Sequence, residues 1–87
     1  MSSDEEDYLS LRGPIDRESG KLVMRIPLDA GGEQLAIVAR GISEIDGDDL
    51  LVTIPHWLAQ KIGVSEGSEV YIDDRWGKFN ITKVAVE

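Results

Sequence analysis

The segment of residues 73–79, DDRWGKF, interleaves basic and aromatic side chains. The cations are Arg75 and Lys78, and the rings belong to Trp76 and Phe79. Such a combination can bind nucleic acid or a peptide, because rings stack on bases and cations attract phosphates and ring faces. The alternative is that the rings cover a small core while the charges keep a hairpin soluble. We favour this alternative, because two aspartates at the start of the segment offset the local positive charge.

The carboxylates and the one histidine do not form a recognisable catalytic or metal-binding pattern. Asp73 and Asp74 are neighbours on an expected strand and would point to opposite faces, so they do not make an acid and base pair. Residues 44–49, EIDGDD, lack the spacing of a calcium loop and are expected to form a solvated turn. His56 has no cysteine or second histidine as a co-ligand and is expected on the surface. The sequence therefore predicts no enzyme activity, no cofactor and no metal site.

The composition favours a protein partner over nucleic acid. Seventeen acidic and nine basic residues among 87 give a formal net charge of −8. This charge repels phosphate backbones at long range and suits a basic partner. No apolar run is long enough to span a membrane and the acidic start lacks a signal-peptide pattern, so a cytoplasmic location is expected.

The first twenty residues are mostly polar and acidic, and we expect residues 1–20 to form a flexible arm. Tyr8, Leu9 and Leu11 are the apolar side chains near its middle. The arm is either a solvated tail or a partner-binding segment in which these three residues dock while the acids steer the encounter.

Residues 21–87 are expected to form one small, mainly β domain with one short helix. Period-2 alternation predicts a strand at 21–27 that ends at Pro27. The apolar run 34–42 is expected to be a second strand, followed by a loop at 43–49 with a tight turn at Asp46-Gly47. A third strand is expected at 50–54.

The remainder predicts a short helix and a final hairpin. Pro55 suits the first turn of a helix over 55–62, and Gly63 suits the left-handed residue that ends it. Strands are expected at 70–73 and 78–86, joined by a turn at 74–77. The expected core, which would also form a dimer interface, consists of Ile54, Trp57, Leu58, Ile62, Val64, Val70 and Ile72.

Residues 52–82 resemble the AbrB/MazE-like (SpoVT-AbrB) family of small bacterial transcription regulators and antitoxins. The likeness lies in Ile54-Pro55 after a strand, Gly63-Val64 after the helix and Glu66-Gly67 in the next turn, and it extends to about residues 37–83. It implies a swapped-hairpin β-barrel made by a homodimer. It also implies operator DNA binding through basic residues near the first strand of the family-like part, where Arg40 is the cation present. Arg75 and Lys78 are the other DNA-binding candidates.

A weak internal similarity gives a second possible arrangement. KLVMRIP at 21–27 parallels LLVTIP at 50–55, and GGEQLAIV at 31–38 parallels EGSEVYID at 66–73. A true repeat would let one chain supply both halves of a barrel and remain monomeric.

Two hypotheses for function follow from the sequence. The first is a non-enzymatic antitoxin-like or transcription-regulatory homodimer that binds a basic protein such as a toxin, and operator DNA. The second is an acidic protein-protein adaptor with an AbrB-like barrel and no nucleic-acid role.

Overall fold

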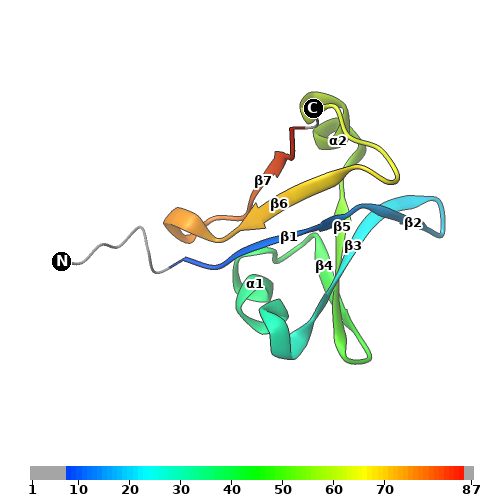
Figure 1. The fold of residues 1–87 in the computed structure, drawn as a ribbon. Helices are drawn as coiled ribbons and strands as arrows, with labels where there is room; N and C mark the ends of the chain where they lie inside the picture. Colours follow the sequence, from blue (N-terminus) through cyan, green and yellow to red (C-terminus); the bar gives the residue numbers. More distant parts are fainter. Residues whose placement is uncertain (1–7, 86–87) are drawn as a thin grey trace.

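The computed structural model describes residues 8–85 as a mainly β fold with two short helices (Figure 1). The N-terminal strands are β1 (Ser10–Pro14), β2 (Asp16–Glu18) and β3 (Lys21–Pro27). They are followed by the 3-10 turn η2 (Leu28–Ala30), α1 (Gly32–Val38), β4 (Ser43–Asp46) and β5 (Asp49–Ile54). The last elements are α2 (His56–Ile62), β6 (Glu69–Asp73), the 3-10 turn η3 (Arg75–Gly77) and β7 (Asn80–Lys83).

The strands form two antiparallel sheets joined by one bent strand. One sheet has the order β1-β6-β7 and the other has the order β2-β3-β5-β4. Only Ile15 separates β1 from β2; its N–H donates to the Ser68 carbonyl at 2.8 Å, and its carbonyl accepts from the Gly67 N–H at 2.7 Å. Within residues 8–85, β4 and β7 each pair on one side only, so the sheets do not close into a barrel.

The core lies between the inner faces of the two sheets. Alternation along β3 and β5 places Met24 opposite Val52 and Ile26 opposite Leu50, and all four side chains are buried. The inner face of β6 adds Val70 and Ile72. Leu35 of α1 and Ala59 of α2 complete the core, and Figure 1 shows the two helices at opposite ends of the fold.

The expected core is confirmed except at one residue. Ile54, Val64, Val70 and Ile72 are buried, and Leu58 and Ile62 are partly buried against them. Trp57, expected as a core anchor, is 65% exposed. The helix turns its small Ala59 toward the core, which leaves Trp57 on an outer face.

Residues 34–42, expected to be a strand, instead contain most of α1 and the turn after it. Leu35 and Ala39 are both completely buried, and the Ala39 N–H donates to the Leu35 carbonyl at 2.9 Å. Gly32 allows the helix to begin against β3, because a Cβ there would lie 2.9 Å from the Ile26 and Pro27 carbonyl oxygens. The apolar run therefore reflects one buried helical turn and not a two-sided strand.

The expectation of a flexible arm is wrong for residues 10–18, which form β1 and β2. Ile15 is completely buried, and Leu9 and Leu11 pack against the core. The segment looked polar because its strands place single apolar residues inward between exposed polar ones. Residues 1–7 of the expected arm lie outside the described residues.

The acidic segment 43–49 forms a hairpin and not only a loop. β4 pairs with β5, and Asp46 lies opposite Asp49, so the expected tight turn is confirmed. Gly47 has a φ of 67°, a left-handed conformation that glycine adopts at little cost. The carboxylates keep this short edge strand soluble.

The C-terminal elements agree well with expectation. Pro55 precedes α2, and Gly63 ends it at φ 75°, with its N–H donating to the Ala59 carbonyl at 2.9 Å. β6 and β7 contain the expected fourth strand and part of the fifth, whose residue 86 lies outside the described range. The proposed internal similarity fails in its second part, because residues 32–38 form a helix where Glu69–Asp73 form a strand.

Candidate binding groove

A groove of about 550 Å³ lies between α2 and the segment that runs from β6 through η3 into β7. We call it the aromatic groove. Its walls carry two tryptophans and several partly buried apolar side chains from both segments. It is lined by Trp57, Leu58, Lys61, Ile62, Asp73, Arg75, Trp76, Phe79, Asn80, Ile81 and Thr82.

Both tryptophans of the protein line this groove and are largely exposed. Trp57 of α2 is 65% exposed and Trp76 of η3 is 74% exposed. The expectation that Trp76 covers the core is therefore wrong, whereas Phe79 does pack partly against it. Trp76 has a φ of 63°, which an L-residue with a bulky side chain adopts only at a cost. The turn thus keeps a large ring in solvent.

Short hydrogen bonds hold the turn that carries Trp76. One carboxylate oxygen of Asp73 accepts from the Arg75 N–H at 3.1 Å and from the Asn80 side-chain amide at 2.8 Å. The same amide contacts the Arg75 carbonyl at 2.9 Å. Asp74 accepts from the Leu9 N–H at 2.7 Å and from the Gln34 amide at 2.8 Å. The two aspartates, expected to be solubilising charges, therefore fix the turn and join it to β1 and α1.

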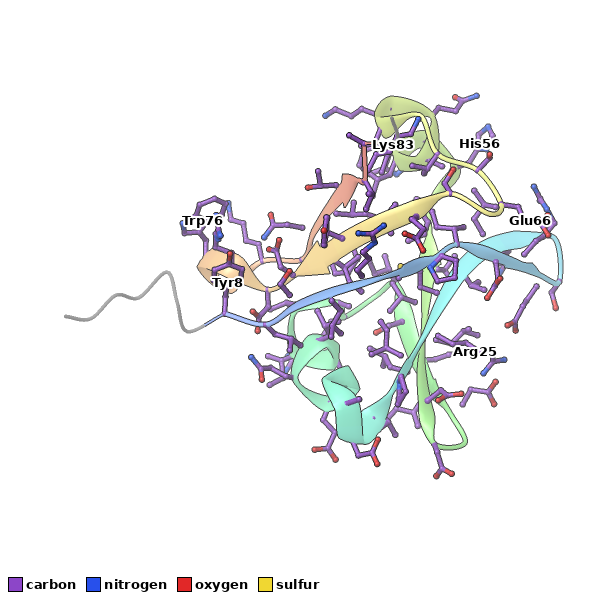
Figure 2. All side chains as sticks on the ribbon, in the orientation of Figure 1. Tyr8, Arg25, His56, Glu66, Trp76 and Lys83 are labelled. Atoms are coloured by element: carbon purple, nitrogen blue, oxygen red, sulfur yellow. The ribbon has the colours of Figure 1, made fainter. Side chains whose placement is uncertain are left out.

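Arg75 packs at one end of the groove against a residue of the N-terminal segment. Its guanidinium lies 4.0 Å from the centre of the Tyr8 ring and 5.2 Å from the Trp76 ring, and it donates to the Tyr8 hydroxyl. Figure 2 shows Tyr8 and Trp76 at this same end of the molecule. Tyr8, Leu9 and Leu11 were expected to bind a partner protein. In the structure, all three contact other residues of their own chain.

Apart from Asp73, the groove is built from two parts of the chain that lack acidic residues. None occurs in residues 50–65 or in residues 75–85, although the chain carries −8 overall. These parts contain Lys61, Arg75, Lys78 and Lys83, and none of the four forms an ion pair with another residue in the range 8–85. The groove is therefore a cationic region on an acidic protein.

The three DNA-binding candidates do not form one surface. Arg75 lines the groove, and Lys78 lies in the chain between Trp76 and Phe79, which line it as well. Arg40 lies elsewhere, in the turn between α1 and β4. The sequence did not indicate Lys61 as a site residue, and it indicated Trp57 only as a core and dimer residue. The absence of acids from 50–65 was the available sequence signal.

One edge of β7 is open beside the groove. The Val84 N–H donates to the Glu69 carbonyl at 3.0 Å. In an antiparallel pair, the backbone groups of successive residues point alternately toward and away from the partner strand. The backbone groups of Thr82 and Asn80 therefore point toward β6, as those of Val84 do. The backbone N–H and C=O groups of Ile81 and Lys83 therefore point away from β6. No strand within residues 8–85 pairs with them.

A separate cluster of charged residues lies around Arg25 on the outer face of the four-stranded sheet. Arg25 contacts Glu18 at 2.7 Å, Asp46 at 2.9 Å and Asp49 at 3.5 Å. Its hydrogen bond to Glu18 lowers the pKa of that carboxyl below the ordinary value. Two carboxylates of the segment 44–49 thus bind an arginine of their own chain, and Figure 2 shows Arg25 far from Trp76.

A second cavity, of about 460 Å³, lies on another side of α2. His56 lines it together with Arg17 and Lys21 and is exposed, as expected. Arg17 is paired with Glu66 at 3.2 Å. Within residues 8–85, no three acidic or histidine side chains are grouped so that they could hold a metal ion.

Comparisons with protein-family models, with curated proteins and with solved structures give no match. The AbrB/MazE-like resemblance therefore stays a prediction. In the described range 8–85, no helix is long and apolar enough to cross a membrane.

Proposed function

We propose that this protein is a non-enzymatic binding module that contacts a protein partner through the aromatic groove. The observation that carries the proposal is the pair Trp57 and Trp76, both exposed on one groove, while the buried core within residues 8–85 is entirely aliphatic. Tryptophan is enriched at protein interfaces, where its large ring supplies much of the binding energy. A fold that leaves both indoles in solvent is well suited to bury them against a partner.

The chemistry of the groove suits binding better than proton transfer. Its carboxylate, Asp73, is occupied by the Arg75 N–H and the Asn80 amide. The remaining lining residues have aromatic, aliphatic, cationic or amide side chains, apart from the hydroxyl of Thr82. Such a surface can bury apolar groups and attract anions, and it offers no free base beside a nucleophile.

The test uses the full chain as bait and then a purified partner. Proteins captured from the source cells are identified, purified and titrated one by one by calorimetry. We expect a direct complex that Trp57→Ala weakens about tenfold or more, a loss of about 1.4 kcal/mol. Ile37→Ala is the control, because Ile37 is also exposed, at 64%, but does not line the groove. If no captured protein binds in purified form, or if both variants bind equally well, the proposal is wrong.

The second candidate is an antitoxin-like or transcription-regulatory homodimer that binds operator DNA. It is favoured by Arg75, which lines the groove with Lys61, and by Lys78 in the chain between the lining residues Trp76 and Phe79. In this arrangement, a second chain would supply strands to the open edges of β4 and β7 and complete a swapped-hairpin barrel. The acidic remainder of the surface opposes DNA binding, which makes this candidate the weaker one.

Two measurements decide the second candidate. Light scattering would give the mass of two chains at all accessible concentrations. Electrophoretic mobility shifts on DNA upstream of the gene would weaken with rising salt and be lost in the double variant Arg75→Glu/Lys78→Glu. Arg40→Ala tests the remaining DNA-binding residue by the same assay. A monomer that gives no shift at low salt rejects this candidate.

A further inference from the structure

Within residues 8–85, four strands lie at sheet edges: β1 and β7 in one sheet, and β2 and β4 in the other. β1 ends at Pro14, which has no N–H to pair, and β2 carries Asp16 and Glu18. β4 carries Glu44 and Asp46, and Asp46 is held by Arg25. β7 has the sequence NITK and contains no acid. Charged side chains on an edge strand discourage a further strand from pairing. β7 is protected by Lys83 alone, and this cation repels basic strands but attracts acidic ones.

The open edge and the aromatic groove belong to the same surface. Ile81 lies opposite Ile72 of β6 and shares its face of the sheet, and Ile81 also lines the groove. A strand added beside β7 would place the side chain opposite Ile81 on this same face. That side chain would lie within the groove that contains Trp57 and Phe79. Backbone pairing and apolar burial are therefore available to one extended ligand.

The charges select the ligand. Lys61 lines the groove, Lys83 lies on β7, and Lys78 lies two residues before β7. None of the three forms an ion pair in the range 8–85, so acidic side chains complement this surface. A second copy of this chain, paired across a two-fold axis at β7, would oppose these cations to themselves. A nucleic-acid strand carries suitable charge but no ladder of N–H and C=O groups for Ile81 and Lys83. An acidic peptide satisfies both requirements.

We propose that the open edge of β7 accepts an extended acidic segment of a partner protein as an additional strand, with an apolar side chain of that segment seated in the aromatic groove. This inference deepens the proposed protein-binding function and rests on it. Main-chain hydrogen bonds to Ile81 and Lys83 give the strand its register, and the groove gives specificity for an apolar residue at one position. Lys61 and Lys78 select acids at the flanking positions.

The test uses as its probe an acetylated nine-residue peptide with valine at the central position and glutamate at every other position. Trp57 and Trp76 are the only tryptophans, so their fluorescence reports binding at the groove directly. We expect a saturable change that weakens as salt rises, because exposed charge pairs are screened. Backbone amide resonances of Ile81 and Lys83 would shift, while those of β4 would not.

Three matched controls separate strand addition from simple attraction. A peptide with the same central valine and lysine at every other position would not bind. A glutamate peptide N-methylated at the amides that face β7 would lose about tenfold or more in affinity. Lys83→Pro would lower the affinity for the glutamate peptide more than Lys83→Ala does. Both substitutions remove the charge, but only proline removes the backbone N–H that points away from β6.

The outcomes distinguish the inference from the function on which it rests. Equal binding by the N-methylated peptide overturns strand addition, even if Lys83→Pro fails to fold. No fluorescence change with the glutamate peptide also overturns it, whereas a purified partner that depends on Trp57 would still support the broader function. Tighter binding of a fifteen-nucleotide oligothymidine than of the peptide, sensitive to Trp76→Ala, would assign the groove to single-stranded nucleic acid instead.

Discussion

Asp73, Asp74 and Asn80 show how single side chains build the candidate site. Together they accept or donate the hydrogen bonds that hold η3, and through Leu9 and Gln34 they attach the turn to β1 and α1. These bonds compensate for the unfavourable left-handed backbone at Trp76. The exposed indole is therefore a consequence of polar contacts around it, and its position before a partner binds is already defined.

Gly32 is a residue whose lack of a side chain is required by packing. An alanine Cβ at this position would lie 2.9 Å from the carbonyl oxygens of Ile26 and Pro27, and backbone atoms cannot move aside as a flexible side chain can. Alanine improves helix propensity by up to about 1 kcal/mol, but overpacking costs about 1–3 kcal/mol. We expect Gly32→Ala to lower the free energy of unfolding in urea.

Gly13→Ala is the matched control for this steric effect. A Cβ at Gly13 would lie 3.3 Å from the terminal methyl group of Met24, which can rotate away. Its cost in the same urea titration should be the smaller of the two. A Gly32→Ala variant as stable as the wild type would contradict the close packing of α1 against the end of β3.

Glu18 gives the protein a component of stability that depends on pH. Its hydrogen bond to Arg25 lowers the pKa of the carboxyl in the folded state. The contribution is therefore fully present above the ordinary glutamate pKa of about 4.3, and is lost as pH falls through the lower folded value. We expect Glu18→Gln to destabilise the protein at neutral pH and to have little effect once the carboxyl is protonated.

Urea titrations at a series of pH values would measure this difference. Glu33→Gln is the control for the general loss of a negative charge, since Glu33 forms no ion pair with another residue in the range 8–85. A difference between Glu18→Gln and wild type that stays constant down to the acid range would contradict the role of Arg25. So would an equal effect of the two substitutions at neutral pH.

At the level of elements, two substitutions in α1 distinguish a helix from a strand at this position. A strand over this run would place Leu35 and Ile37 on the same face, whereas the helix buries Leu35 completely and leaves Ile37 64% exposed. We expect Leu35→Ala to cost about 2–5 kcal/mol, and Ile37→Ala to change stability by less than about 0.5 kcal/mol. Urea denaturation of the two variants measures both, and comparable losses would support a strand.

The sequence predicts those elements whose local pattern matches their environment. β3 and β5 alternate apolar and polar residues because each has one buried face, and Pro55 and Gly63 delimit α2 by backbone chemistry alone. α1 was mistaken for a strand because its short apolar run also suits a strand. Its helical form depends on Leu35 and Ala39 meeting the sheet, and on the close fit of Gly32 against β3. These contacts join parts of the chain that local patterns do not relate.

The candidate site was predicted only in part for the same reason. The basic and aromatic segment 73–79 is evident from the sequence, but whether its rings are buried is not. The answer depends on Asn80 and Asp73 fixing the turn, and on α2 turning Ala59 inward so that Trp57 faces outward. A second signal was available in the lack of acids from residues 50–65 and 75–85. This signal is a local absence of acidic residues, which neither the net charge nor the basic and aromatic motif reveals.

At the level of the whole molecule, the charge is divided between two regions. The outer face of the four-stranded sheet holds a network of carboxylates around Arg25, and the aromatic groove holds Lys61 and Arg75 with Asp73 as its one lining acid. A net charge of −8 therefore does not describe the surface that a partner would meet. An acidic ligand would be repelled by most of the molecule and attracted at one place, which favours an oriented encounter.

The continuity of β1 and β2 also changes how the N-terminal segment should be tested. Deleting residues 1–20 would remove two strands and the buried Ile15, so loss of partner binding in that variant would only report unfolding. A deletion confined to residues 1–7 removes no residue of the described fold. It isolates the acidic residues of the start from Tyr8, which contacts Arg75.

Ile15 joins the two sheets, and its truncation should weaken both together. The side chain is completely buried, and its backbone bonds to Gly67 and Ser68 continue the pairing of β1 with β6 where β2 begins to pair with β3. We expect Ile15→Ala to cost about 2–5 kcal/mol in one cooperative transition.

Far-ultraviolet circular dichroism would report the sheets, and the tryptophan fluorescence would report the groove at the end of the three-stranded sheet. The two urea curves should shift by the same amount, whereas Ile45→Ala, at a residue 65% exposed on β4, should leave both in place. Separate transitions would mean that the two sheets fold independently, and that the strand through Ile15 connects them without coupling their stability.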